Sequence, residues 1–346
     1  MSKKALIAMS GGVDSSVAAL LMKKAGYDCI GAMMRLWGGT NEQDEKDAAA
    51  VAERLGIPFY VFDCSDEFQN RVINKFIDTY EKGATPNPCL DCNRFMKFGA
   101  LYRKARELGC DYIATGHYAV TELDKTTGRY LLKKAADSAK DQSYVLYSLS
   151  QEILRHVILP LGRHTKSEIR KIAEENGFVN SHKKESQDIC FVPDGDYASF
   201  IERERGKTYP PGEFVITDGE IVGRHSGIIR YTIGQRKGLG VSYRVPLYVC
   251  AKDMEHNRVI LTEGRDLFSK EVTAADINLI SVDRIEDGMR VSARTRYNMK
   301  EQPAAAYQTD ENTIKVVFDE PQRAAAPGQA LVLYSGKSVV GGGTII

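Results

Sequence analysis

Several features that would assign a protein to a narrow class are scarce or missing in this sequence. Of its 346 residues, seven are cysteines and one is tryptophan. In a reducing compartment an odd number of cysteines argues against a disulfide framework and leaves thiols available for reaction or metal binding. No apolar run approaches the roughly 20 residues of a membrane span. We find no low-complexity tract and no convincing internal repeat, which disfavours fibrous and repeat architectures.

A strong charge of either sign is also missing. Lysine and arginine number 47 against 46 aspartates and glutamates, which gives a formal net charge of +1. A nucleic-acid partner would therefore have to be held by local basic patches and not by the overall charge. The apolar run Ala5–Met9 is too short for the hydrophobic region of a signal peptide, so we expect a cytoplasmic protein without a membrane part.

The first part of the chain alternates between strand and helix patterns. Strands separated by long helices indicate a parallel, doubly wound sheet, in which ligands lie at the carboxyl ends of the strands. The predicted strands are Lys4–Met9, Asp28–Leu36, Phe59–Asp63 and Asp111–Thr115, and the predicted helices are Ser15–Ala25, Asp44–Leu55, Glu67–Glu81 and Asn93–Leu108.

Beyond about residue 200, glycines and short β-branched runs become frequent. Short strands at close spacing with turn residues between them predict small β-barrels. The runs include Glu213–Ile216, Ile228–Thr232, Leu247–Cys250, Arg258–Leu261, Ala330–Tyr334 and Ser338–Val340. We therefore expect an α/β protein in which an N-terminal doubly wound domain, residues 1–200, precedes two small β-barrel domains, residues 201–272 and 273–346.

The segment Ser10–Ser16 (Ser-Gly-Gly-Val-Asp-Ser-Ser) lies between the first predicted strand and the first predicted helix. Glycines let the backbone approach an anion, and the helix start offers unsatisfied N–H groups at its positive end. A tight turn with a serine cap is the alternative interpretation. The segment lacks the Gly-Lys-Ser/Thr ending of a Walker loop and the spacing of a dinucleotide fingerprint.

This segment resembles the PP-loop of the ATP pyrophosphatase superfamily. Enzymes of that superfamily cleave ATP between the α and β phosphates and adenylate an oxygen. The resemblance implies an ATP site formed by Ala8, Met9, Ser10, Gly11, Gly12, Val13, Asp14, Ser15, Ser16, Met34 and Gly116. The motif fixes the activation chemistry and leaves the substrate open.

Two groups of cysteines are candidates for reactivity. Cys89 and Cys92 precede a helical segment that carries Lys97, and a helix start with a nearby lysine is expected to lower a thiol pKa. Cys190 follows far along the chain. A structural zinc site, which usually needs four ligands, a redox pair and a sulfur-transfer pair all remain open. The other four cysteines have apolar neighbours and are expected to be structural: Cys29, Cys64, Cys110 and Cys250.

Two basic stretches contain no acidic residue. They are Gly223–Gly240 and Arg290–Lys300, and Tyr297 lies within the second. Basic residues interleaved with an aromatic side chain suit contacts with RNA phosphates and bases. A solvated barrel face is the alternative interpretation of either stretch.

Together these segments resemble the tRNA-specific 2-thiouridylase family along the whole chain. Besides Ser10–Ser16, the segments that carry the resemblance are Thr85–Phe98, Ala114–Ala119, Lys140–Tyr144, Ser186–Phe200, Tyr231–Gly240, Arg296–Tyr297 and Arg323–Gln329. The resemblance implies magnesium- and ATP-dependent 2-thiolation of the wobble uridine in tRNAs for glutamate, glutamine and lysine codons. It also implies a persulfide donor protein, either a relay protein or a cysteine desulfurase.

The resemblance assigns individual roles as well. Cys92 would be the nucleophile and Cys190 the persulfide-bearing cysteine. Residues implied to contact tRNA or its target base are Asn87, Pro88, Cys89, His117, Lys140, Asp141, Gln142, Arg296, Tyr297 and Gln329. Another PP-loop ligase or amidotransferase acting on a small molecule, or a non-catalytic RNA-binding protein with a nucleotide pocket, are the alternatives.

The sequence departs from the family pattern at Cys89. Many relatives have aspartate there, and that carboxylate is assigned acid/base work. Cys89 could be a spectator, a resolving thiol or, together with Cys92 and Cys190, a ligand of an iron–sulfur cluster. We favour the first two roles over the cluster.

Overall fold

The N-terminal half contains the predicted doubly wound parallel sheet. The computed structural model describes residues 2–38, 42–183 and 189–346. Five strands pair in the order β3-β2-β1-β4-β7, and every pairing is parallel. Their bounds are β1 Lys4–Ala8, β2 Asp28–Arg35, β3 Phe59–Asp63, β4 Tyr112–Ala114 and β7 Val157–Ile158. The strand order reverses between β1 and β4, which makes the carboxyl end of β1 a switch point, where ligands bind in such sheets.

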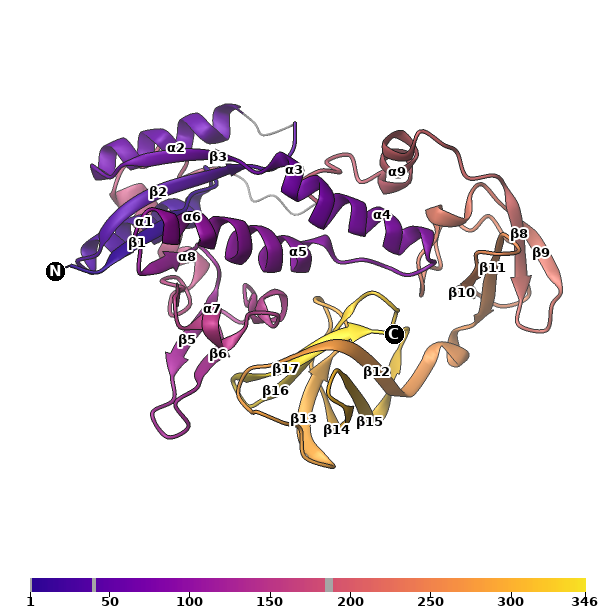
Figure 1. The fold of residues 1–346 in the computed structure, drawn as a ribbon. Coiled ribbons are helices and arrows are strands. Elements are labelled where there is room, and N and C mark those ends of the chain that lie inside the picture. The colour runs from indigo at the N-terminus through magenta and orange to yellow at the C-terminus, as the bar shows by residue number, and fades with distance from the viewer. Residues whose placement is uncertain (1, 39–41, 184–188) are drawn as a thin grey trace.

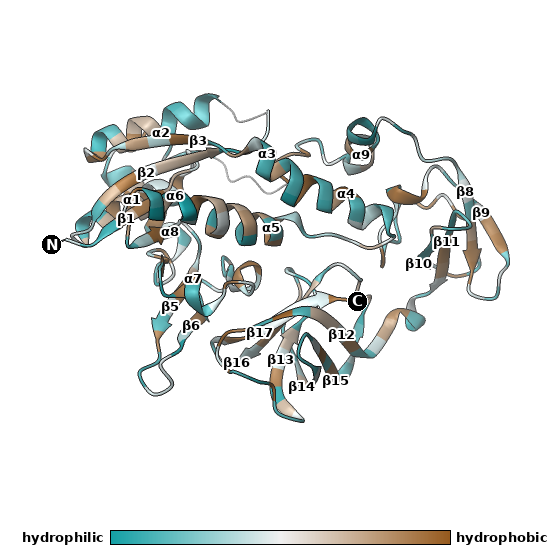
Figure 2. Cartoon of the chain, in the orientation of Figure 1, coloured by the Kyte–Doolittle hydropathy of each residue, from teal (hydrophilic) through white to brown (hydrophobic). Residues whose placement is uncertain are grey.

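Helices cover both faces of this sheet (Figure 1). Alternate residues of β1 point to opposite faces, so Ala5 and Ile7 pack against α1, α2 and α8, while Leu6 packs with α6 and the preceding π-helix η2 (Cys92–Ala100) on the other face. The helix bounds are α1 Val13–Lys24, α2 Glu42–Leu55, α6 Leu101–Glu107 and α8 Lys166–Glu175. Apolar colour concentrates on the inner strands in Figure 2.

Two long helical segments connect the sheet to the rest of the molecule. The predicted helices Glu67–Glu81 and Asn93–Leu108 are present, but each contains a stretch of wider π-helix. The first runs as α3 Ser65–Phe68, η1 Gln69–Ile73 and α4 Asn74–Glu81, and the second as α5 Pro88–Asp91, η2 Cys92–Ala100 and α6. π-Helical turns often occur at functional sites, and η2 begins at Cys92.

The segment after α9 (Tyr197–Arg205) forms a four-stranded sheet in the order β10-β11-β8-β9. Its strands are β8 Gly212–Ile216, β9 Ile221–His225, β10 Leu247–Asp253 and β11 Arg258–Glu263. The predicted strand Ile228–Thr232 is wrong. Residues Ile228–Arg230 form the 3₁₀ helix η4, and Ile228 and Ile229 are both buried in one apolar cluster. A short apolar run does not by itself distinguish a strand from a buried turn of helix.

The last segment is a closed six-stranded barrel. Its order is β12-β15-β14-β13-β16-β17, and an antiparallel pairing between β12 and β17 closes it. The strands are β12 Phe268–Leu279, β13 Met289–Arg294, β14 Gln302–Asp310, β15 Thr313–Arg323, β16 Ala330–Ser335 and β17 Ser338–Ile345. The 3₁₀ helix η5 Gly264–Leu267 leads into it. Closure leaves no free strand edge inside the ring.

The sequence patterns gave no sign of a hairpin that joins the two halves. Strands β5 Ala119–Leu123 and β6 Tyr130–Lys134 extend the barrel sheet through a β6–β17 pairing, Lys133 with Ser338. The 3₁₀ helix η3 Ser143–Leu146 and helix α7 Gln151–Leu154 follow. No helix in the described part of the chain is long and apolar enough to cross a membrane.

Candidate functional site

The segment after β1 has a backbone shape that only glycine permits. Gly11 has a φ of 73°, and a Cβ atom there would lie 2.3 Å from the Asp44 carbonyl oxygen. Helix α1 begins at Val13, and its N-cap Gly12 provides no side-chain hydrogen bond. The first N–H groups of a twelve-residue helix are therefore left uncapped by a side chain, as anion binding requires.

Serine hydroxyls and one distant amide hold this loop in place. The Ser10 N–H donates to Ser15 Oγ at 3.1 Å, and the hydroxyls of Ser15 and Ser16 both donate to the Gly12 carbonyl at 3.0 Å. Asn180 Nδ2 donates to the Gly11 carbonyl and to Ser16 Oγ, both at 2.9 Å. The buried serines thus fix the loop, and the backbone N–H groups remain as donors for a phosphate.

The loop after β4 packs directly against the segment Ser10–Ser16, which we call the phosphate loop. A Cβ atom on Gly116 would lie 2.8 Å from both Asp14 C and Ser15 N, so no side chain fits there. Asp14 accepts hydrogen bonds from Lys166 Nζ and from the Tyr118 hydroxyl, all at 2.8 Å. The structure therefore brings Gly116, which the PP-loop resemblance implies as a nucleotide-site residue, to the phosphate loop.

Two lysines beside the loop escaped the sequence analysis. Lys183 Nζ contacts the Gly11 carbonyl at 3.3 Å and forms ion pairs with Asp44 and Asp47. Lys166 is the first residue of α8 after a capping box at Thr165. A lysine at the first position of a helix is unfavourable because its charge opposes the helix dipole. That unusual position is the sequence signal that could have identified Lys166. Lys183 carried no such signal.

The remaining expected nucleotide-site residues lie in or at the ends of the first two strands and at the start of α1. Met9 and Val13 are buried in the core on the α1 face, and the Met9 N–H donates to the Ala32 carbonyl at 2.8 Å. Ala8 ends β1, and Met34 lies near the end of β2.

The two candidate catalytic cysteines are brought together from distant segments. Cys92 follows α5 and is half-buried, whereas Cys89 and Cys190 are exposed. Negative charge on Cys190 and on Cys89 raises the pKa of Cys92, so the three sulfur atoms lie within electrostatic range of one another. All seven cysteines are free thiols, of which Cys29, Cys64 and Cys110 are buried as expected and Cys250 is half-buried.

The expectation of a lowered thiol pKa at this helix start is wrong. Burial raises the pKa of Cys92 to about 11, and the opposing effect of Lys97 is smaller. Burial also raises the pKa of Cys190, again with Lys97 acting in the opposite direction. Helix α5 has only four residues, and Cys92 packs against an apolar cluster, so loss of hydration outweighs both the helix end and the lysine.

Lys97 lies between the thiols and His117, whose neighbour Gly116 packs on the phosphate loop. Lys97 Nζ lies 3.3 Å from His117 Nε2, and Thr115 Oγ1 lies 2.7 Å from His117 Nδ1. Burial, and then the charge of Lys97, hold the pKa of His117 well below its ordinary value, so the ring is neutral. Lys97 donates to Nε2, which leaves Nδ1–H to donate to Thr115.

Similarity to known proteins extends over the whole chain. Residues 3–194 match the family described as tRNA methyl transferase HUP domain, 198–263 its PRC-barrel domain, and 269–345 the aminomethyltransferase beta-barrel domain. The tRNA-specific 2-thiouridylase MnmA of Clostridioides difficile is 49% identical over 355 residues, which cover 100% of this chain and 98% of that protein. The chain belongs to the tRNA-specific 2-thiouridylase family.

Two further proteins illustrate this similarity. The 2-thiouridylase MnmA of Acetivibrio thermocellus is 49% identical over 99% of both chains. A solved 4-thiouridine synthetase–RNA complex with bound ATP aligns with a TM-score of 0.42 and 20% identity over 58% of this chain and 50% of that one.

Several residues that the 2-thiouridylase resemblance assigns to tRNA make contacts within the protein. The Asp141 carboxylate accepts the N–H groups of Ala135 and Ser143 at 3.0 and 3.2 Å, and Gln142 Oε1 accepts the Tyr118 N–H at 2.8 Å. The Tyr297 hydroxyl donates to the Asp141 carbonyl at 3.3 Å. These side chains therefore shape the loop that carries Lys140.

The barrel of this 2-thiouridylase-family chain also holds the loop before α5. Gln329 Nε2 donates to the carbonyls of Thr85 and Pro86, each at 3.0 Å, directly before Asn87 and Pro88. An Arg296 guanidinium nitrogen donates to the Ile233 and Ala324 carbonyls at 3.0 and 2.8 Å. Ser186–Asp188, which also carry the family resemblance, lie outside the described residues.

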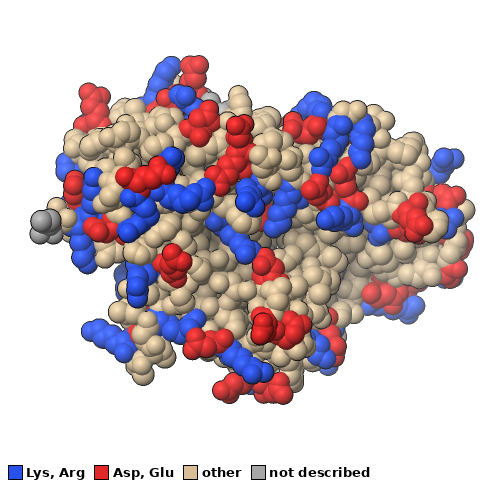
Figure 3. All heavy atoms as spheres, viewed as in Figure 1, with Lys and Arg blue, Asp and Glu red and all other residues tan. Residues whose placement is uncertain are grey.

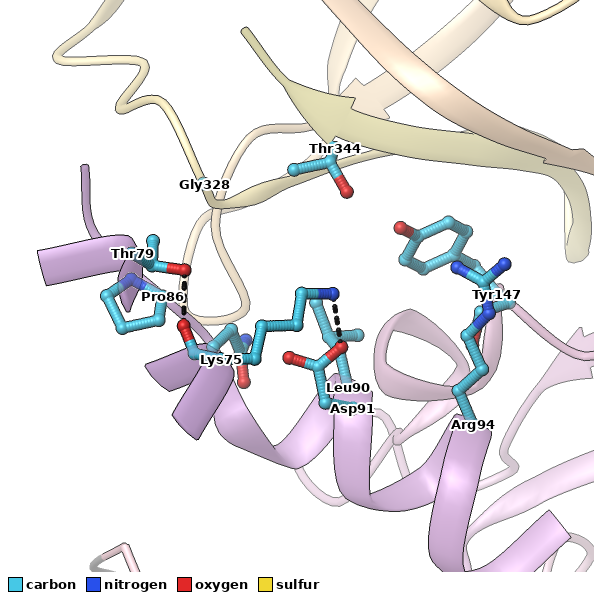
Figure 4. Close-up of a pocket in the computed structure, with 11 residues that line it drawn as sticks. Lys75, Thr79, Pro86, Leu90, Asp91, Arg94, Tyr147, Gly328 and Thr344 are labelled. Atoms are coloured by element: carbon cyan, nitrogen blue, oxygen red, sulfur yellow. Dashed lines mark hydrogen bonds and ion pairs between the residues drawn. The ribbon is translucent and has the colours of Figure 1, made fainter. Parts of the chain in front are cut away.

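A small cavity separates α5 from the barrel (Figure 4). It has a volume of about 60 Å³, and Gly328 and Thr344 of the barrel line one side. On the opposite side Lys75 Nζ pairs with the buried Asp91 at 2.7 Å, and Arg94 lies next to them. Figure 3 shows Lys and Arg interspersed with Asp and Glu on this face of the molecule. Both cations at the cavity are paired with carboxylates, Lys75 with Asp91 and Arg94 with Asp276.

The two basic stretches are partly neutralised by the fold. Arg230 pairs with Glu202 at 2.8 Å, Arg290 with Asp319 at 2.7 Å, and Arg294 with Glu301 at 3.1 Å. Arg224, Arg236 and Lys237 are exposed. Most of these carboxylates come from segments far along the chain, which a scan for acid-free stretches does not detect. In the described ranges, no three His, Cys, Asp or Glu side chains are grouped to hold a metal ion.

Proposed function

We propose that this chain is an ATP-dependent tRNA uridine 2-sulfurtransferase. Its substrates are the wobble uridines of tRNAs for glutamate, glutamine and lysine codons, as the family resemblance implies. One observation carries the proposal: the phosphate loop is linked to the thiols through two contacts and the charge of Lys97. Gly116 packs on Asp14 and Ser15, its neighbour His117 contacts Lys97, and Lys97 acts on Cys92 and Cys190.

In the first step the phosphate loop binds magnesium–ATP as a substrate. The carboxylates beside the loop are paired with lysines, Asp14 with Lys166 and Asp44 with Lys183, which favours an ion that arrives on the phosphates. The uncapped N–H groups of α1 stabilise the negative charge that develops on the phosphates. O2 of the uridine attacks the α phosphate, pyrophosphate leaves, and the adenylated oxygen becomes a good leaving group.

In the second step a persulfide on Cys190 supplies the sulfur. Its terminal sulfur attacks C2 of the activated base, directly or as hydrosulfide released by Cys92, and AMP leaves. Cys92 forms a disulfide with Cys190, which must be reduced before the next cycle. Lys97 favours the thiolate form of both cysteines, while burial keeps Cys92 protonated until it reacts.

Recognition of tRNA would use both halves of the molecule. Tyr297 is 38% exposed and is available to stack on a base. Asp141, Gln142 and Gln329 act by holding the loops next to the site, and Asn87 to Cys89 border the target base. The chemistry requires a flipped uridine, a cytoplasmic persulfide donor protein and tRNA at the same crevice.

Mass spectrometry of nucleosides tests the proposal. Unmodified glutamate tRNA is incubated with the protein, magnesium–ATP and glutathione persulfide as the sulfur donor, and 2-thiouridine that disappears without ATP is the expected product. Cys92→Ser and Cys190→Ser should each abolish it, whereas Cys250→Ser in β10 should not. AMP and pyrophosphate without thiouridine would indicate a different acceptor.

A further inference from the structure

The candidate nucleophile lies one helical turn from a more accessible thiol. Cys89 is exposed, whereas Cys92 is half-buried and packs against the apolar cluster around Phe76. The backbone is helical from Pro88 onward, with φ and ψ of −60° and −43° at Cys92. Residues three apart on a helix have Cβ atoms about 5–6 Å apart. A small backbone shift brings them to the roughly 3.5–4.5 Å that a disulfide requires.

Cys190 completes a cluster of three thiols. Charge on Cys190 and Cys89 acts on Cys92, and charge on Cys89 acts on Cys190. Thiol–disulfide exchange needs a thiolate that can reach one sulfur of a disulfide. Ile189 and Phe191, on either side of Cys190, pack in the same apolar cluster as Cys92, so the fold brings this segment to the Cys89–Cys92 helix.

We propose that Cys89 is the resolving thiol of the transfer cycle, a role that rests on the proposed function. After sulfur transfer, the sulfur atoms of Cys92 and Cys190 are joined. The Cys89 thiolate attacks Cys92 Sγ, so that a Cys89–Cys92 bond forms and the Cys92–Cys190 bond breaks. The electron pair of the broken bond leaves on Cys190 as a thiolate. One disulfide is consumed and one is formed, and Cys190 is free to accept the next persulfide sulfur.

A low-molecular-weight monothiol such as glutathione supplies the two electrons that complete the cycle. One molecule attacks the exposed Cys89 sulfur and releases the Cys92 thiolate. A second attacks the resulting mixed disulfide, leaves as oxidised glutathione and restores the Cys89 thiol. Without Cys89, the exposed sulfur is that of Cys190, and glutathione attack there blocks the persulfide-bearing cysteine as a mixed disulfide.

A single-turnover experiment detects the exchange directly. The chain is loaded with glutathione persulfide, desalted, and given unmodified glutamate tRNA and magnesium–ATP without reductant. Peptide mapping of the non-reduced product should show a Cys89–Cys92 link and a free Cys190 thiol. In Cys89→Ser, for each thiouridine formed, the link should instead remain between Cys92 and Cys190. Because Cys89 is exposed, serine should not disturb folding.

Multiple turnovers provide the second readout. For each variant the turnover in glutathione is divided by its own turnover in dithiothreitol. This ratio should be at least about tenfold lower for Cys89→Ser than for the unaltered chain. The control Cys250→Ser keeps its hydrogen bond to the Ile260 carbonyl and should behave as the unaltered chain. Equal ratios for Cys89→Ser and the unaltered chain, or no Cys89–Cys92 link, would overturn the resolving role. Absence of thiouridine from the unaltered chain would instead overturn the proposed function.

Discussion

The phosphate loop and the thiol cluster are linked through Gly116, His117 and Lys97 but are built differently. The loop is a single segment whose own backbone and serines fix its shape, with Gly11 in a conformation and a space that no other residue fits. The thiol cluster combines α5 with the segment at Cys190, and the barrel residue Gln329 holds the loop before α5. The activity of the phosphate loop should therefore be lost mainly through substitutions within the loop. The thiol cluster should also respond to substitutions in elements far along the chain.

The largest effect is expected at Gly11. Alanine there would cost about 1 kcal/mol for its left-handed backbone, and its Cβ would collide with the Asp44 carbonyl at 2.3 Å. Displacing the loop should reduce pyrophosphate release more than about hundredfold. The rate of pyrophosphate release in the presence of tRNA measures it.

Gly26→Ala is the matched control for that substitution. Gly26 has a similar φ of 83°, but no atom lies within 4 Å of the added Cβ. It should lower the free energy of unfolding by about 1 kcal/mol and leave pyrophosphate release unchanged. Similar activity of the two variants would show that the space at Gly11 does not determine the loop.

A smaller effect is expected at Asn180, a distant residue that helps to hold the loop. Asn180→Ala removes two hydrogen bonds, to the Gly11 carbonyl and Ser16 Oγ. At about 1 kcal/mol each, their loss should raise KM for ATP about tenfold or more. Asn176→Ala, which removes a bond to Ile172 in α8, should leave KM unchanged. An unaltered KM in Asn180→Ala would make the loop independent of distant support.

The thiol cluster should respond to pH through Lys97. Because the pKa of Cys92 is raised to about 11, its alkylation by iodoacetamide should accelerate steadily as pH rises above neutral. Lys97 lowers that pKa, so Lys97→Met should move the alkylation profile to higher pH. Lys104→Met, which removes an exposed pair with Glu107, should leave the profile in place. A profile that moves to lower pH would contradict the assigned contact.

The smallest effect is expected at the ion pair between η2 and the barrel. Arg94 and Asp276 are both substantially exposed, so Asp276→Asn should change the free energy of unfolding by less than about 1 kcal/mol. Asp276 has a φ of 51°, which asparagine tolerates well. Urea denaturation at low and high salt measures the effect. A larger loss would show that this pair, and not the packing around it, joins the two halves.

The parallel sheet and the phosphate loop could be predicted from the sequence because each depends on a contiguous segment. The sheet follows from alternating strand and helix patterns, and the loop from one motif. β1, β2 and β3 lie within a residue of the expected bounds, and Gly11 lies at the expected turn. The 3₁₀ helix Ile228–Arg230 was predicted as a strand because a short apolar run such as Ile228-Ile229 fits either structure.

The thiols show what the sequence could not provide. The spacing of Cys89 and Cys92 was visible, but their hydration depends on side chains from other segments, and burial reversed the expected direction of the pKa. Lys183 and Asn180 reach the loop from far along the chain, where no local motif marks them. Ion pairs such as Arg230 with Glu202 likewise appear only when the fold brings the partners together.

The closure of the barrel by β17 has a consequence for synthesis. β17 pairs with β12 and β6, and its Val339 packs in the same apolar cluster as Leu6 of β1 and Tyr144. These two residues are translated long before β17. A nascent chain therefore carries an uncovered apolar face until the barrel strands leave the ribosome, and that face is where a chaperone would bind. The part of this cluster that the barrel supplies, including Val339, is thus added last during synthesis.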